Sequence, residues 1–171
     1  MTTEFSRPIR AAHIHADEQT HDLEADEAAR AALAARFGLP GIAALSGRFT
    51  LHHERGGIIA AQLAMTARVT QLCVITLEPF EADIAEQVEL RFVPAAKLEG
   101  DEEVLAPESL EGPDEIPYED GIIDLGEALA EQLALALDPY PRKPGAVLPD
   151  EASDGEANPF AALKGKFGKL V

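Results

Sequence analysis

Apolar and polar residues alternate from residue 42 to residue 94, and this pattern predicts antiparallel strands. The Glu-Arg-Gly-Gly stretch at residues 54–57 can adopt the positive φ angles of a tight hairpin turn. Glu78 and Pro79 mark a second turn. The segment is therefore predicted to form four antiparallel strands in a meander. One face of the long strand before Glu78 is expected to present Val69, Gln71, Cys73 and Ile75.

A helical pattern is present from about Ala25 to Phe37. An acidic first turn precedes an alanine-rich segment, and Gly38 followed by Pro40 ends the helix. Its apolar positions at helical spacing are Ala28, Ala32, Leu33 and Phe37.

A second helix is predicted to begin after Asp124. This residue is a good N-cap, and Glu127 three residues later resembles a capping box. The helix is expected to end at Asp138 and Pro139. Leu135 lies off the leucine stripe and predicts burial on more than one side. The stripe consists of Leu125, Leu129, Leu133 and Leu137.

The remaining segments complete the predicted organisation. Residues 5–15 are expected to form a short edge strand, and residues 95–118 a long acidic loop. The fold class is a single α+β domain over residues 1–140, with a curved, mostly antiparallel sheet of about five or six strands packed by two helices. An acidic, Pro- and Gly-rich linker at residues 141–157 and a basic C-terminal tail at residues 158–171 follow.

Charge is the most unusual global feature of the 171 residues. The formal net charge is −17, and fourteen carboxylates without any Lys or Arg lie between Glu99 and Asp138. Nucleic-acid affinity arises from basic groups that release counterions, so broad RNA binding by this body is disfavoured. A basic partner protein, or a local contact through the tail, is compatible with the charge.

Composition excludes several other classes. No apolar run is long enough for a membrane span, and the N-terminus does not resemble a secretion signal, so a cytoplasmic protein is expected. No hydrolase, nucleotide-binding or zinc-protease motif is present, which disfavours an enzyme. We therefore expect no cofactor, no small-molecule substrate and no membrane partner.

Cys73, the single cysteine, is predicted to lie in the middle of a strand. Only Arg68 supplies a cation within five residues of it, whereas a reactive thiolate needs a positive environment. A buried apolar filler is the favoured interpretation. Among the histidines, His13 and His15 alternate on one predicted strand face and could bind metal, with His21 or Asp17 as a third ligand. A chance grouping is the simpler explanation.

The basic tail is the stronger functional candidate. Its apolar residues recur every three or four positions, and three lysines lie between them. One interpretation is an amphipathic segment that docks on its own domain; the other is a segment that folds on a partner and reaches phosphates with its lysines. The predicted partner-binding residues are Phe160, Leu163, Lys164, Lys166, Phe167 and Lys169.

Three segments together resemble the YceD family of large ribosomal RNA subunit accumulation proteins. They are VTQLCVITLEPF at 69–80, IIDLGEALAEQLALALDPYP at 122–141 and NPFAALK at 158–164. Many family members have a Cys-x-x-Cys pair before the turn, but here Thr76 occupies the second position, so a cysteine-based metal or redox site is not expected. The signature positions are Cys73, Leu77, Pro79, Asp124, Leu125, Pro139, Asn158, Pro159 and Phe160.

The resemblance implies a bacterial, non-enzymatic factor in the synthesis, processing or stability of 23S ribosomal RNA. Charge adds the expectation that the acidic body binds a basic ribosomal or assembly protein, while RNA is reached indirectly or through the tail. Two alternatives stay open. One is a metal-dependent RNA-processing enzyme that uses His13, His15, Asp120 and Asp124. The other is an acidic, chaperone-like binder of a basic protein.

Overall fold

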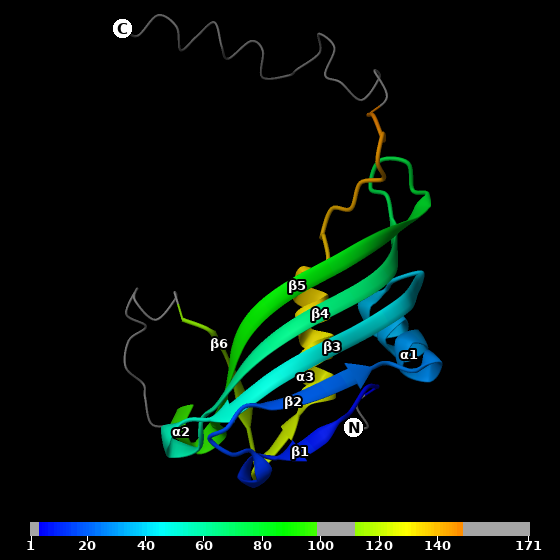
Figure 1. Ribbon diagram of the computed structural model, residues 1–171. Helices are drawn as coiled ribbons and strands as arrows, with labels where there is room; N and C mark the ends of the chain where they lie inside the picture. Colours follow the sequence, from blue (N-terminus) through cyan, green and yellow to red (C-terminus); the bar gives the residue numbers. More distant parts are fainter. Residues whose placement is uncertain (1–3, 99–111, 149–171) are drawn as a thin grey trace, which may run out of the picture.

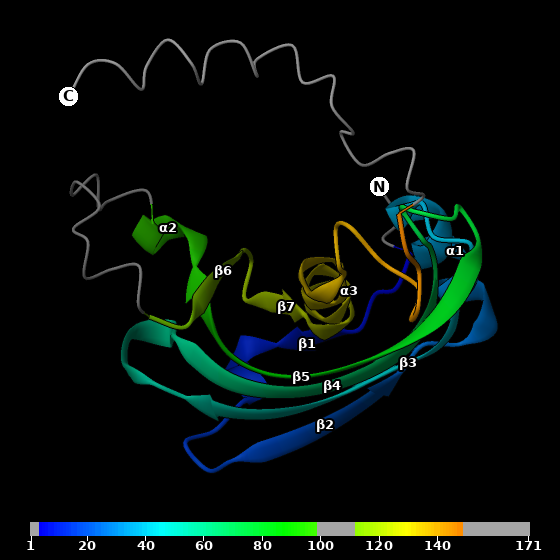
Figure 2. The same ribbon diagram turned by 90° about the horizontal axis from the view of Figure 1, so that it is seen from above.

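A computed structural model describes residues 4–98 and 112–148 of the chain. A curved five-stranded sheet has the order β2-β3-β4-β5-β6, and α3 lies against its concave face (Figures 1 and 2). Only the β5–β6 pair is parallel. The strands are β2 (Gln19–Glu24), β3 (Gly41–His53), β4 (Ile59–Leu72), β5 (Pro79–Pro94) and β6 (Asp114–Tyr118).

A second sheet pairs β1 (Pro8–Arg10) with β7 (Ile122–Asp124) in antiparallel register. The helices are α1 (Glu27–Phe37), α2 (Ala95–Leu98) and α3 (Leu125–Ala136), and 3-10 turns span Ala11–His13 and Arg55–Gly57. The predicted fold class, an α+β domain with a mostly antiparallel sheet packed by helices, is confirmed. No helix among the described residues is long and apolar enough to cross a membrane.

The core lies between the concave face of the sheet and α3. Leucines 125, 129 and 133 of α3 are almost fully buried, as are Phe49, Leu63 and Phe92 of the sheet. Gly47 makes the close approach of β3 and α3 possible, because a Cβ at this position would lie 2.8 Å from Leu129 Cδ1 and 3.1 Å from Leu63 Cδ1. Close packing against Leu129 and Leu63 therefore explains why a glycine lies in the middle of this strand.

The hairpin between β3 and β4 is confirmed. Gly56 and Gly57 have φ angles of 76° and 81°, and the Tyr118 hydroxyl donates a hydrogen bond of 2.6 Å to the Gly57 carbonyl. The number of strands was wrong: residues 42–94 form three strands, because β4 is one continuous strand of 14 residues. Its alternation is unbroken, with every second residue from Ile59 to Gln71 buried, and no turn residue interrupts it.

Both predicted helices are present, but their ends and some of their buried residues differ from the prediction. The α1 helix begins at Glu27 because Asp26 is its N-cap, and the Asp26 carboxylate accepts the Ala29 N–H at 2.8 Å. Ala28 is exposed, whereas Ala29 is buried. Helix α3 ends at Ala136, two residues before Asp138. Leu135 is 73% exposed, so it does not contribute to the broad burial of this helix, which comes from Ala128, Ala130 and Gln132.

Two predicted segments differ in structure. The expected strand at residues 5–15 is reduced to β1, since the chain turns into a 3-10 helix at Ala11. The expected loop at residues 95–118 begins with α2 and ends with β6, whose backbone pairs with the end of β5. Residues 99–111 lie outside the described part of the chain.

Candidate functional site

The turn between β4 and β5, residues 73–78, is closed by its own backbone. The Cys73 N–H donates to the Glu78 carbonyl at 2.9 Å, and the Leu77 N–H donates to the Cys73 carbonyl at 2.8 Å. We call this segment the β4–β5 turn. Cys73 is therefore the first residue after the strand, and the prediction of a mid-strand position was wrong. Ile75 is likewise in the turn.

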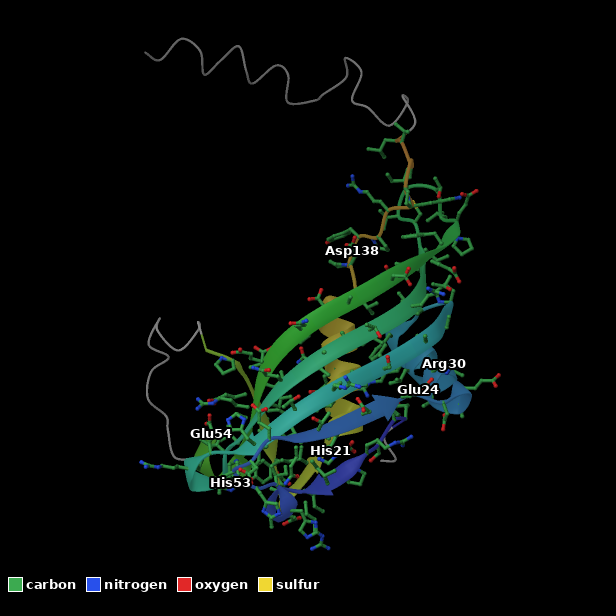
Figure 3. The ribbon with its side chains drawn as sticks, in the orientation of Figure 1. His21, Glu24, Arg30, His53, Glu54 and Asp138 are labelled. Atoms are coloured by element: carbon green, nitrogen blue, oxygen red, sulfur yellow. The ribbon has the colours of Figure 1, made fainter. Side chains whose placement is uncertain are left out.

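The chain that follows α3, residues 138–148, returns to this turn (Figure 1). The Val74 N–H donates to the Pro141 carbonyl at 2.9 Å, and the Gln71 side-chain amide donates to the Asp138 carbonyl at 3.1 Å. Lys143 Nζ lies 2.9 Å from a carboxylate oxygen of Glu78. We call residues 138–148 the post-helix segment. Figure 3 places Asp138 at the opposite end of the sheet from Glu54 and His53.

Exposed apolar side chains are concentrated on these two segments and the adjoining end of β4. Among the described residues, eight large apolar side chains are exposed, and six of them belong here. We call this set the apolar tip. It consists of Leu72, Val74, Leu77, Tyr140, Val147 and Leu148. Grouped exposed apolar residues on a protein surface are characteristic of a protein-binding site.

Leu77 is unusual in backbone as well as in exposure. Its φ angle is 57°, in the left-handed region that bulky residues avoid, and its side chain is 76% exposed. A left-handed backbone in a residue other than glycine costs about 1–3 kcal/mol and is concentrated at functional sites. A leucine that is both strained and exposed gains nothing from burial in this fold, which indicates a role in contact with another molecule.

Cys73 is fully buried at the base of the turn, as predicted. The Thr76 N–H approaches its Sγ at 3.5 Å. Hydrogen bonding by the Thr76 side chain, opposed by burial and assisted by backbone N–H groups of Lys143, Thr76 and Ile75, lowers the pKa of the thiol to about 7. Lys143 was missed by sequence reasoning because seventy residues separate it from Cys73, and only the fold brings the two segments together.

Other signature residues have structural tasks. The Asp124 carboxylate accepts the N–H groups of Gly126 at 3.0 Å and Glu127 at 3.2 Å, which confirms the N-cap. It also accepts the Arg7 N–H at 2.7 Å and the Ser6 hydroxyl, and so ties α3 to the N-terminal segment. Leu125 is buried, and Pro79 begins β5.

The predicted tail site lies outside the described residues. This holds for Asn158, Pro159, Phe160, Leu163, Lys164, Lys166, Phe167 and Lys169. The division of the chain at residue 140 stays a prediction, although Pro141 and Lys143, which were assigned to the linker, contact the β4–β5 turn.

The histidines are not arranged as predicted. His13 ends a 3-10 turn, so it does not alternate with His15 on a strand. In the described ranges 4–98 and 112–148, no three His, Cys, Asp or Glu residues are grouped as metal ligands would be. Asp124, proposed as a catalytic carboxylate in the enzyme alternative, is occupied by the bonds of its cap.

Comparison with known families matches residues 61–165 to the family described as large ribosomal RNA subunit accumulation protein YceD. The match covers more than half of the chain and includes most of β4 and all of β5, α3 and the post-helix segment. No curated protein and no solved structure matches this chain.

Proposed function

We propose that this chain, which belongs to the YceD family of large ribosomal RNA subunit accumulation proteins, supports 23S ribosomal RNA by binding a basic ribosomal or assembly protein. In this proposal the protein is not an enzyme. The family supplies the RNA pathway, and the apolar tip is the observation that supports binding to a protein.

Electrostatics favours a protein over RNA as the direct partner of the body. The net charge is −17, and phosphate groups would be repelled by most of the surface. Several cations of the described part are already paired with carboxylates: Arg36 with Glu127, Arg48 with Asp22, Arg68 with Asp83 and Arg91 with Glu54. A cationic protein surface would instead be attracted at long range.

The apolar tip supplies the short-range part of this contact. Aromatic and aliphatic side chains that lose water in an interface provide most of its binding energy, surrounded by polar groups at the rim. Leu77 and Tyr140 are the most suitable anchors, because they combine a large side chain with exposures of 76% and 72%. Glu78 and Lys143 lie beside them as a charged rim.

The test is affinity purification of the full chain from cells, with and without ribonuclease, followed by identification of the bound proteins and RNA. We expect one or more ribosomal or assembly proteins to be retained after ribonuclease treatment. The double variant Leu77→Ser, Tyr140→Ser should lose them and change the level of precursor 23S RNA.

A matched control is Leu135→Ser, which removes a leucine of similar exposure from α3 outside the apolar tip. This variant should retain the partner. If the double variant retains the same proteins and leaves precursor 23S RNA unchanged, the proposal is wrong. A purification that yields no ribosomal component would also contradict it.

The tail is proposed to make a second contact, with the partner or with RNA. Charge reversal of its three lysines, Lys164→Glu, Lys166→Glu and Lys169→Glu, tests this in the full chain. RNA retention should fall if the lysines contact phosphate. The chaperone-like alternative, without a role in RNA, predicts that neither the variant nor ribonuclease changes what is retained.

A further inference from the structure

The outer edge of β5 lacks a neighbouring strand over most of its length. β5 pairs with β4 from Pro79 to Phe92, but β6 pairs only with Leu90–Pro94 (Figure 1). Within the described chain, residues 79–89 therefore have one side of the backbone without a strand partner. We call these residues the free edge. Unpaired N–H and C=O groups of such an edge can bind another strand.

A groove runs beside the free edge. Its apolar lining comes from four residues of β5, from the last residue of α3 and from one residue that follows it: Phe80, Ala82, Ile84, Ala85, Ala136 and Pro141. Its charged lining consists of Asp83, Glu86, Asp138 and one cation, Arg142. The three side chains Phe80, Ala82 and Ile84 are only half-buried. An added strand could place every second side chain over them, at the period of two that strands impose.

Charge restricts what can bind at this edge. Residues 79–90 contain four carboxylates and no Lys or Arg: Glu81, Asp83, Glu86 and Glu89. All four are exposed. Asp83 is paired with Arg68 of β4 at 2.8 Å. A second copy of the same edge would bring carboxylates against carboxylates, which opposes self-pairing. A segment with lysines or arginines would instead gain charge pairs.

The opposite edge of the sheet is a weaker candidate. β2 has six residues, against eleven in the free edge of β5. Its Asp22 is paired with Arg48 of β3 at 2.6 Å. The pocket that includes residues of β2 is lined jointly by β2, β3 and β4, so it lies over the sheet and not outside its edge.

We propose that the free edge of β5 binds an extended, lysine- or arginine-bearing segment of a protein partner as an additional strand. This inference rests on the basic partner of the proposed function and specifies the surface and the binding mode. Backbone hydrogen bonds would supply affinity, and the groove and the carboxylates would select alternating apolar and cationic side chains. The carboxylates also exclude copies of the chain itself.

The test uses the full chain and a synthetic probe, a ten-residue peptide of alternating lysine and valine with blocked termini. Backbone amide hydrogen exchange is measured for residues 79–89. Alternate amides, those that do not bond to β4, should gain protection. At a peptide concentration ten times Kd, their exchange should slow by about tenfold.

Two matched controls separate strand addition from simple attraction. The same peptide with an N-methyl group on every residue retains its charge but lacks the backbone donors of both edges, and it should not protect the edge. Glu81→Lys and Glu24→Lys change the net charge equally, but only Glu81 lies on the free edge, so only Glu81→Lys should weaken binding of the unmodified peptide severalfold.

Four outcomes would overturn the proposal. The first is equal binding of the N-methylated peptide, and the second is unchanged exchange at residues 79–89. The third is protection of residues 79–89 in the absence of peptide that is lost in the tail variant K164E/K166E/K169E. Such a result would mean that the chain's own tail occupies the edge. The fourth is protection that decreases on dilution as a dimer dissociates. Each could occur while the ribonuclease-resistant partner and the 23S phenotype persist, so the proposed function is tested separately.

Discussion

Leu77 shows how a single residue that destabilises the fold can indicate function. Its left-handed backbone and its exposed side chain both oppose stability, and neither is compensated within the described part of the fold. We therefore expect the Leu77 side chain to contact another molecule and not to stabilise the fold.

We predict that Leu77→Gly leaves the protein at least as stable as it is now. Glycine removes about 1–2 kcal/mol of left-handed strain but adds roughly 0.4–1 kcal/mol of unfolded-state entropy, so the free energy of unfolding should rise by up to about 1.6 kcal/mol. Urea unfolding measures this. The control Val74→Gly, at an exposed neighbour whose φ is not positive, should lower it by roughly 0.5–1 kcal/mol. A clear loss at Leu77 would show that its side chain stabilises the turn.

Cys73 gives a prediction for the dependence on pH. Its pKa of about 7 lies below the ordinary thiol value of 9.0, so the folded state favours the thiolate. The resulting stabilisation is complete above pH 9 and is lost as pH falls through 7. The free energy of unfolding of the native chain, relative to Cys73→Ser, should therefore increase between pH 7 and pH 9. A difference that is constant with pH would mean that the thiol stays protonated.

Thr76→Val tests the cause of this pKa. Hydrogen bonding by the Thr76 side chain is the largest contribution to the lowered value, and valine preserves its shape without the hydroxyl. The pKa of Cys73, followed by thiolate absorbance, should rise. A pKa that stays near 7 would assign the effect to the backbone N–H groups instead.

At the residue scale, the sequence predicted chemical roles only where the partners are local. Asp124 was identified as an N-cap because the two backbone N–H groups that donate to its carboxylate lie two and three residues away. Its bonds to Ser6 and Arg7 were not predicted, because those residues are 118 and 117 positions away. Lys143 was missed at Cys73 for the same reason.

Helix α3 gives the prediction at the scale of elements. Asp124→Ala should lower the free energy of unfolding by about 2–4 kcal/mol, because an N-cap contributes about 0.5–2 and each further hydrogen bond about 1. Asp26→Ala at α1 is the matched control, since within the described ranges its carboxylate accepts a hydrogen bond from Ala29 alone. It should cost about 0.5–2 kcal/mol. Equal losses in urea unfolding would show that the ties to Ser6 and Arg7 add nothing.

Elements could be predicted wherever residues with a specific conformation mark their ends. Gly38 and the Gly56–Gly57 pair have positive φ angles, and both mark ends that were correctly predicted. Inside β4 no glycine or proline marks an end. The alanines at positions 60, 61 and 64 also weaken the apolar–polar alternation, so the pattern could not distinguish one long strand from two shorter ones. Strand β6 could not be predicted, because its pairing with β5 depends on a parallel contact across an acidic segment.

At the scale of the whole molecule, charge should dominate the response to salt. A net charge of −17 destabilises the compact state through self-repulsion. Raising sodium chloride from about 0.01 to 0.15 M shortens the screening length from roughly 30 to 8 Å. The melting temperature should therefore rise over this interval. A fall would mean that the ion pairs, such as Arg36 with Glu127, outweigh the repulsion.

The pairing of β1 with β7 has a consequence for synthesis of the chain on the ribosome. Arg7 and Pro8 cannot reach their partners until Asp124 and Leu125 have been translated, roughly 6 to 24 seconds later at ordinary rates of elongation. During that interval, the nascent strands β2 to β5 can pair while their apolar concave side is still without α3. The newly made protein thus passes through a stage in which it needs protection from aggregation, and emergence of residues 125–136 ends that stage.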